Sequence, residues 1–178
     1  MIEDPQEQEI PDIYSQFDDF LKAAVSEYYE RGGKAKRANF ISLIIASGEI
    51  GSLAMDQIKT GAGFKKIALG AAGVLALRIG LKYVLGGPLG LILAGATAAS
   101  LIAYFVRNRG EIATTIVRHR KLVLEMRKSY EKLQSDHRDG RLDDDQRELM
   151  VDGLMKRFLD DVDDPDWKPE EDDEEEGS

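Results

Sequence analysis

PLGLILAGATAASLIAYFV, residues Pro88–Val106, is a run of nineteen residues without a charged side chain. As a helix, a run of this length extends for about 30 Å, which matches the hydrocarbon thickness of a bilayer. Tyr104 and Phe105 lie near its end, where aromatic side chains favour the membrane interface, and Arg107 follows directly. The run therefore predicts a membrane-spanning helix.

The preceding run, Ile67–Leu85, has the same length and is joined to the first by the turn signal GGP at residues 86–88. It carries Arg78 and Lys82, which are one helical turn apart. An arginine near the centre of a spanning helix costs about 2.5–3.5 kcal/mol, and less when the side chain extends to the interface. This penalty is tolerable beside an uncharged second helix, so residues 64–107 are predicted to form a two-helix membrane hairpin.

Small side chains repeat at four-residue steps along both predicted helices. Such rows allow helix backbones to approach closely in lipid, where packing drives association. The predicted packing positions are Ala68, Ala72, Ala76 and Gly80 in the first helix and Gly90, Ala94 and Ala98 in the second. The alternative is a glycine- and alanine-rich hairpin that is buried inside a helical bundle, as in pore-forming toxins before insertion.

Charge is segregated along the chain. Residues 1–30 have a net charge of −8, residues 31–138 of +12 and residues 139–178 of −13. A basic centre around the most apolar segment favours contact with a bilayer that has anionic head groups. Nucleic acid is not expected as a partner, because the acidic ends would repel its phosphates and aromatic residues are not interleaved with the bases.

Lysine and arginine flank the predicted hairpin on both sides, with seven in residues 31–66 and nine in residues 107–138. Because positive flanks favour the cytoplasm, the chain is predicted to be an integral membrane protein with both termini cytoplasmic. A shallow hairpin that enters one leaflet is the alternative. The predicted membrane-interface residues are Lys65, Lys66, Arg78, Lys82, Arg107 and Arg109.

Two helical segments are predicted before the hairpin. Apolar residues recur at three- and four-residue steps from Ile13 to Tyr28, which predicts an amphipathic helix that ends at the RGG of residues 31–33. The next segment, residues 39–59, has a wide apolar arc that two acids interrupt. We expect this segment to be packed or interfacial rather than spanning.

A long helix is predicted over residues 110–138, where apolar residues recur at heptad spacing. This seam favours a coiled coil that self-associates or binds a protein partner. Packing on the residue 12–30 helix of the same chain is the alternative. A shorter helix, capped near Asp143, follows and extends to residue 159.

The predicted fold class is therefore all-α, with a two-helix membrane hairpin, flanking amphipathic helices and disordered acidic termini. Residues 160–178 hold twelve acids and one lysine, a composition typical of disorder. The predicted organisation is a disordered acidic lead-in (1–11), an amphipathic helical segment (12–60), the membrane hairpin (64–107), a cytoplasmic helical hairpin or coiled coil (110–159) and a disordered acidic tail (160–178).

No pattern in the sequence identifies an enzyme, a cofactor or a metal site. The chain contains no cysteine, and His119 and His137 lie eighteen residues apart and form no metal pair. Residues 135–146 resemble an EF-hand loop with Gly140 in place, but three of the ligand positions lack carboxylates. We therefore expect a plain helix-turn-helix there.

These features predict a membrane-anchored helical scaffold or adaptor that recruits partners through its cytoplasmic helices and acidic tail. The alternative is a pore- or lesion-forming protein that resembles colicins or holins in architecture alone, as an apolar hairpin with flanking amphipathic helices. We favour the scaffold, because few polar side chains would line a conductive path. They are Arg78, Lys82, Thr97 and Ser100.

Overall fold

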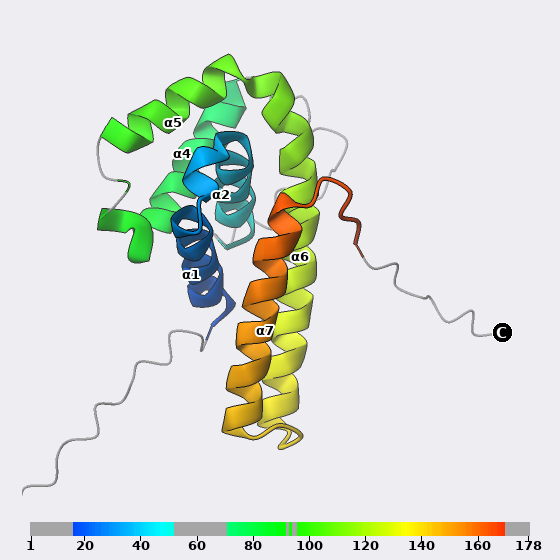
Figure 1. Cartoon of the computed structure of the whole chain (residues 1–178). Helices are drawn as coiled ribbons and strands as arrows, with labels where there is room; N and C mark the ends of the chain where they lie inside the picture. The colour runs from blue at the N-terminus through cyan, green and yellow to red at the C-terminus, as the bar shows by residue number, and fades with distance from the viewer. Residues whose placement is uncertain (1–15, 52–70, 92, 94–95, 170–178) are drawn as a thin grey trace, which may run out of the picture.

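A computed structural model of the chain describes residues 16–51, 71–91, 93 and 96–169 (Figure 1). Within these ranges the chain forms six α-helices and two short 3-10 helices and contains no strand, which confirms the predicted all-α class. In chain order the elements are α1 (Phe17–Glu30), η1 (Gly33–Ala35), α2 (Arg37–Gly51), α4 (Ala71–Leu85), η3 (Pro88–Leu91), α5 (Ala96–Arg107), α6 (Arg109–Arg138) and α7 (Asp144–Asp163). The predicted lead-in of residues 1–11 lies outside the described residues.

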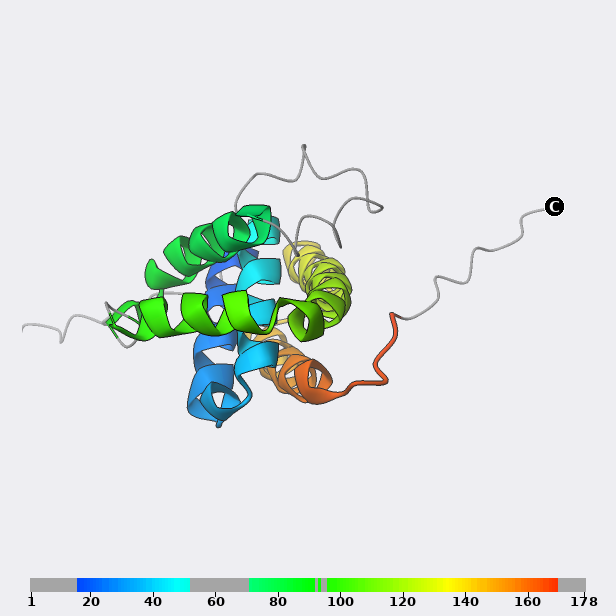
Figure 2. The same cartoon turned by 90° about the horizontal axis from the view of Figure 1, so that it is seen from above.

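Helix α2 is the centre of the fold. Residues 40–48 are all buried, so the helix is enclosed on every side, as expected for a helix that is apolar all round. It contacts each of the other five α-helices described, and most extensively α6 and α4. Figure 2 shows α2 between α4 on one side and α6 and α7 on the other, with α5 crossing over it. Of the two positions expected for residues 39–59, packed or interfacial, the described part of that segment has the packed one.

Two glycines bring α2 and α4 into backbone contact. A Cβ atom on Gly48 would lie 2.3 Å from the Cα of Gly80, and a Cβ atom on Gly80 would lie 2.4 Å from the carbonyl oxygen of Ile44. Both positions lack space for any side chain. The row of small residues on α4 therefore includes a position that contacts another helix of the same chain.

The expectation of an integral membrane protein with both termini cytoplasmic is contradicted. Among the described residues, no helix combines the length and the apolar character that crossing a bilayer requires. Helices α4 and α5 have 15 and 12 residues. At 1.5 Å per residue they extend about 22 Å and 18 Å, short of the roughly 30 Å of a hydrocarbon core. The chain turns through η3 between them, and α4 packs its inner face on α2.

Helices α6 and α7 form an antiparallel hairpin that extends beyond the other helices (Figure 1). The heptad seam of α6 is buried, and it lies within the chain because α6 packs mainly on α2 and α7. Tyr130 of this seam also contacts α1, where its ring centroid lies 5.2 Å from that of Phe20 and 5.7 Å from that of Phe17. The seam is thus covered within one chain, as the alternative proposed, but mainly by α2 and α7, and the residue 12–30 helix contributes the smaller contact.

The connection between α6 and α7 is a tight turn. Gly140 adopts a positive φ of 71°, which glycine tolerates without strain. Asp143 then caps α7: its side chain accepts a hydrogen bond from the Gln146 backbone at 2.8 Å, and the Gln146 side chain accepts one from the Asp143 backbone at 3.1 Å. This reciprocal capping box fixes the start of α7 near the position that the sequence predicts.

Candidate interaction surfaces

The predicted membrane-interface residues are distributed over three helices. Arg78 and Lys82 are exposed on α4, Arg107 is exposed at the end of α5, and Arg109 is partly buried at the start of α6. Lys65 and Lys66 lie outside the described residues. The structure therefore places Arg78 and Lys82 together on one helix face, with the chain turn of η3 between them and Arg107.

The predicted packing residues have different environments. Gly80 contacts α2, whereas a Cβ atom on Gly90 would meet the carbonyl oxygen of Leu85 at 2.2 Å, so Gly90 packs on the end of its own hairpin. Ala76 and Ala98 are partly buried against the core. Ala72 is in α4, and Ala68 and Ala94 lie outside the described residues.

The outer face of α4 combines apolar and basic side chains. Leu75 and Ile79 are 58% and 44% exposed. Arg78, which lies between them in the sequence, and Lys82, which follows them, are also exposed. These four residues, which we call the α4 face, lie opposite the buried side of the helix because they occur at three- and four-residue steps. At the end of α5, Val106 is also exposed, at 43%.

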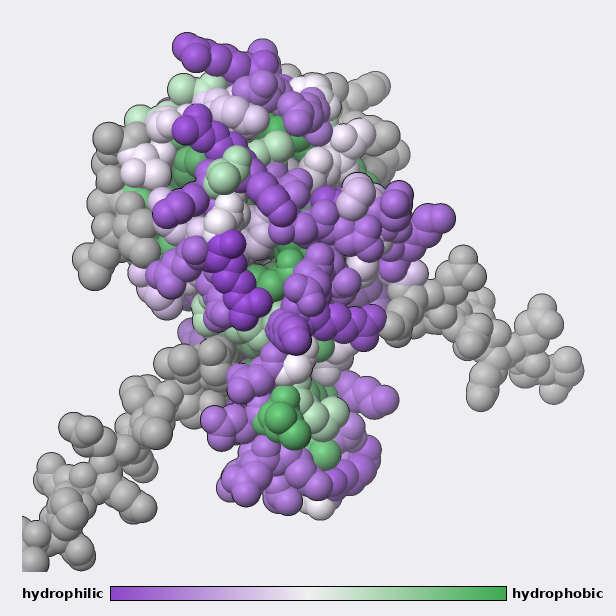
Figure 3. All heavy atoms as spheres, in the orientation of Figure 1, coloured by the Kyte–Doolittle hydropathy of each residue, from purple (hydrophilic) through white to green (hydrophobic). Residues whose placement is uncertain are grey.

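A second exposed apolar surface lies on α7. Leu149 and Met150 are 74% and 49% exposed, and a Cβ atom on Gly153, one turn later, would have no neighbour within 4 Å. We call these three residues the α7 patch. Figure 3 shows green atoms surrounded by purple ones on this lower part of the hairpin.

Leu149 and Met150 lie in the predicted last helix, but the sequence pattern was not used to predict that they are exposed. A signal was present, because the buried residues of α7 form one stripe that leaves both outside. The stripe consists of Val151, Met155, Phe158, Leu159 and Val162. A helical projection of residues 144–163 would therefore have identified the patch.

The degenerate EF-hand sequence forms the turn between α6 and α7. Arg141 donates to the carboxylates of Asp136 and Asp139, the latter at 2.8 Å, so a guanidinium already neutralises the acids of this turn. No cluster of three or more potential metal ligands is found in the part of the chain that the structure describes. The turn is a structural element of the hairpin.

The C-terminal end of α7 is held by a polar cluster at the junction with α1 and α2. The Asp163 carboxylate accepts hydrogen bonds from the Tyr28 hydroxyl at 2.7 Å, from Lys36 Nζ at 2.7 Å and from Asn39 Nδ2 at 3.2 Å. Burial alone would raise the pKa of Asp163, but these hydrogen bonds outweigh it and lower the pKa below the usual value. The pKa of Tyr28 is raised, mainly because the hydroxyl is buried and secondly because it donates a hydrogen bond to Asp163.

Two neighbours on α6 cap the last turn of α7. The Val162 carbonyl accepts hydrogen bonds from Arg118 at 3.1 Å and from Nε2 of the fully buried His119 at 3.0 Å. Because a carbonyl only accepts, Nε2 carries the proton and Nδ1 is the unprotonated nitrogen. Burial is the main cause that lowers the pKa of His119 to about 4. The hydrogen bond to Val162 acts in the opposite direction, and the nearby positive charge of Arg118 lowers the pKa further.

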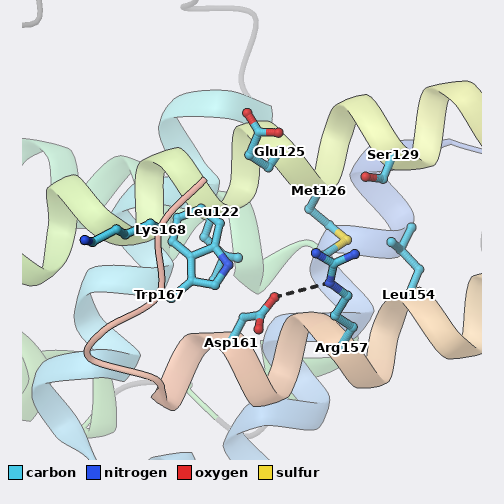
Figure 4. A pocket seen from close by; sticks show the side chains of 9 residues that line it. All are labelled: Leu122, Glu125, Met126, Ser129, Leu154, Arg157, Asp161, Trp167 and Lys168. Atoms are coloured by element: carbon cyan, nitrogen blue, oxygen red, sulfur yellow. Dashed lines mark ion pairs between the residues drawn. The ribbon is translucent and has the colours of Figure 1, made fainter. Parts of the chain in front are cut away.

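Two hollows border this end of α7. The hollow in Figure 4 lies between α6 and α7, where Trp167 folds back over Leu122 and lies beside Asp161, which pairs with Arg157. Its volume of about 40 Å³ has room for a few water molecules and is too small for an organic ligand. The other, about 240 Å³ beside Asp163, is open and lined by charges of both signs.

The Trp167 contact extends the ordered chain into the predicted acidic tail. Helix α7 continues to Asp163, and residues 164–169 are described beyond it, so the first half of residues 160–178 is folded onto the hairpin. The remainder lies outside the described residues. Trp167 was not predicted to be ordered, although a single tryptophan among acids is an unusual feature for a disordered tail.

The exposed apolar side chains thus form two helix faces at different ends of the molecule. The α4 face lies beside α5, and the α7 patch lies on the part of the hairpin that extends away from the other helices (Figure 1). Exposed apolar surface flanked by charges is typical of sites that contact other macromolecules. Comparison with known protein families, curated proteins and solved structures finds no match for this chain.

Proposed function

We propose that the protein is a helical scaffold that associates with a second copy of itself through the α7 patch. The observation that carries the proposal is the 74% exposure of Leu149 beside the exposed Met150. Burial of one large aliphatic side chain contributes about 1.5–3 kcal/mol. A symmetric pair of patches would cover such side chains on both chains at once.

Gly153 supports the choice of a helix as the contacting element. A glycine inside an exposed helix costs about 1 kcal/mol relative to alanine, so its place in α7 weakens the isolated helix. The surface of α7 at Gly153 is open, because a Cβ atom there would have no neighbour within 4 Å. Leu149 and Met150 lie four and three residues before Gly153. A second helix can approach closely there while its own side chains pack beside the two apolar residues.

The charges of α7 favour an antiparallel pair. Glu148 and Asp152 come before Gly153, and the exposed Lys156 comes after it, whereas Arg157 pairs with Asp161 of its own helix at 3.7 Å. In a two-fold symmetric antiparallel pair centred near Gly153, Lys156 of each helix would lie near the two acids of its partner. A parallel pair in register would instead place identical charges opposite each other.

The size of the contact between two α7 helices determines the expected affinity of the dimer. Helix α7 has 20 residues, and two helices of that length bury an area at the lower end of stable interfaces. We therefore expect a concentration-dependent dimer with a dissociation constant on the order of micromolar. Reversible association of this strength suits a scaffold that assembles where its local concentration rises.

Sedimentation velocity of the full chain over a wide concentration range tests the proposal. The unchanged protein should shift from monomer to dimer, and the double variant Leu149→Glu, Met150→Glu should remain monomeric. The matched control is Ala99→Glu with Ala103→Glu, which adds the same charge at exposed positions of α5 and should still dimerise. A monomer at every concentration, or equal dimerisation of both variants, would overturn the proposal.

A further inference from the structure

We infer that the α4 face binds the anionic head groups at the surface of a lipid bilayer. The inference is independent of self-association through α7. On α4 the inner residues Leu77, Leu81 and Val84 are buried, so the exposure of Leu75 and Ile79 is additional to the packing that holds the helix. These two side chains have no role in the core.

The charges on this surface are of one sign. Arg78 and Lys82 are exposed, and neither forms an ion pair with another described residue. The sequence contains no acid from residue 57 to residue 110, whereas it holds seven lysines and arginines there. No neighbouring carboxylate in this segment therefore neutralises the bases, and their charge is available to an anionic partner.

The mixture of side chains favours lipid over an acidic protein. Basic side chains beside anionic lipid contact the head groups, while aliphatic side chains on the same helix face enter the boundary below them. The α4 face is a helix surface, and the two hollows described above lie on other elements. An acidic peptide would be better held by a groove that contacts it on two sides.

The position of the face agrees with a surface contact. Helix α4 lies on one side of the central helix α2, and α6 and α7 lie on the other (Figure 2). The hairpin of α6 and α7 also extends beyond the other helices (Figure 1). Contact of the α4 face with head groups would therefore leave the hairpin accessible to other molecules.

Flotation of the full chain with lipid vesicles at physiological salt tests the inference. Vesicles of phosphatidylcholine with about one-third phosphatidylglycerol should bind the protein, and vesicles of phosphatidylcholine alone should not. The double variant Arg78→Glu, Lys82→Glu should bind the anionic vesicles at least about tenfold more weakly, because each lost base removes about a factor of five. Leu75→Ser with Ile79→Ser should also weaken binding without any change of charge.

The control is Lys128→Glu with Lys132→Glu, which makes the same change of charge at the same spacing on α6. This variant should bind as the unchanged protein does, and circular dichroism should show that all variants are equally helical. Equal binding to both kinds of vesicle, or an equal loss in both charge variants, would overturn the inference. So would displacement from the vesicles by polyglutamate at low concentration, because it would identify an acidic polypeptide as the ligand.

Discussion

Gly48 of α2 and Gly80 of α4 meet backbone to backbone, so that a Cβ atom on Gly48 would lie 2.3 Å from the Cα and 2.8 Å from the nitrogen of Gly80. No flexible side chain is available to move aside at this crossing. The spacing of the two helices therefore depends on the absence of a side chain at both positions. The contact joins the most apolar segment of the chain to the central helix, and it explains how that segment is accommodated within the bundle.

Gly48→Ala should destabilise the protein by about 1–3 kcal/mol, because α2 and α4 must separate to admit the methyl group. In a helix without such a neighbour, the same change stabilises by up to about 1 kcal/mol. Gly110→Ala in α6 is the matched control, since a Cβ atom there meets nothing within 4 Å. Urea unfolding measures both effects. Equal midpoints for Gly48→Ala and the unchanged protein would show that the helices do not touch there.

The stability of the protein should fall as pH is lowered from 7 to 5, because His119 is held neutral in the fold. Its pKa is about 4 in the folded chain and 6.5 when unperturbed, so the unfolded chain binds the proton first. The stabilisation from neutral His119 is complete above pH 6.5 and is lost as the pH falls toward 4. The free energy of unfolding should therefore fall by about 2 kcal/mol between pH 7 and pH 5.

Urea unfolding at several pH values measures this loss. His119→Gln keeps an amide that can donate to the Val162 carbonyl but does not titrate, so its stability should be much flatter over the same range. The partly buried His137, whose Nε2 lies 2.8 Å from the Asp144 carboxylate, offers the comparison, because His137→Gln should retain the decline. A decline that is the same in both variants would assign the pH dependence to other groups.

The peripheral helices were predictable because each carries one apolar stripe and clear end signals. The long helix predicted over residues 110–138 lies at Arg109–Arg138, and the helix after it begins directly after its predicted cap, Asp143. Local patterns of this kind depend on 3.6-residue periodicity and on side-chain capping, which neighbours in sequence determine. The turn at residues 86–88 likewise follows the end of α4 at Leu85.

The surroundings of the apolar hairpin were not predictable in the same way. Composition states how apolar a helix is, but lipid and a protein interior both accept apolar side chains, and small residues permit close helix packing in either. In this fold the apolar α4 packs in the protein interior because the central helix α2 is buried on every side. Helices α4 and α6 make the most extensive contacts that bury it. The bond between Tyr28 and Asp163 joins residues 135 positions apart and leaves no local signal.

Tyr28→Phe should lower the free energy of unfolding by about 1 kcal/mol, because it removes one hydrogen bond to the charged Asp163 side chain, which is itself 35% exposed. Lys36 and Asn39 remain to hold the carboxylate, which limits the loss. The control is Tyr29→Phe: this hydroxyl has no hydrogen bond to any described residue, and the ring keeps its contact with Phe40 at 5.2 Å. Its stability should change by less than about 0.5 kcal/mol in the same urea titration. Equal effects at the two neighbouring tyrosines would mean that Asp163 does not anchor α7 to α1.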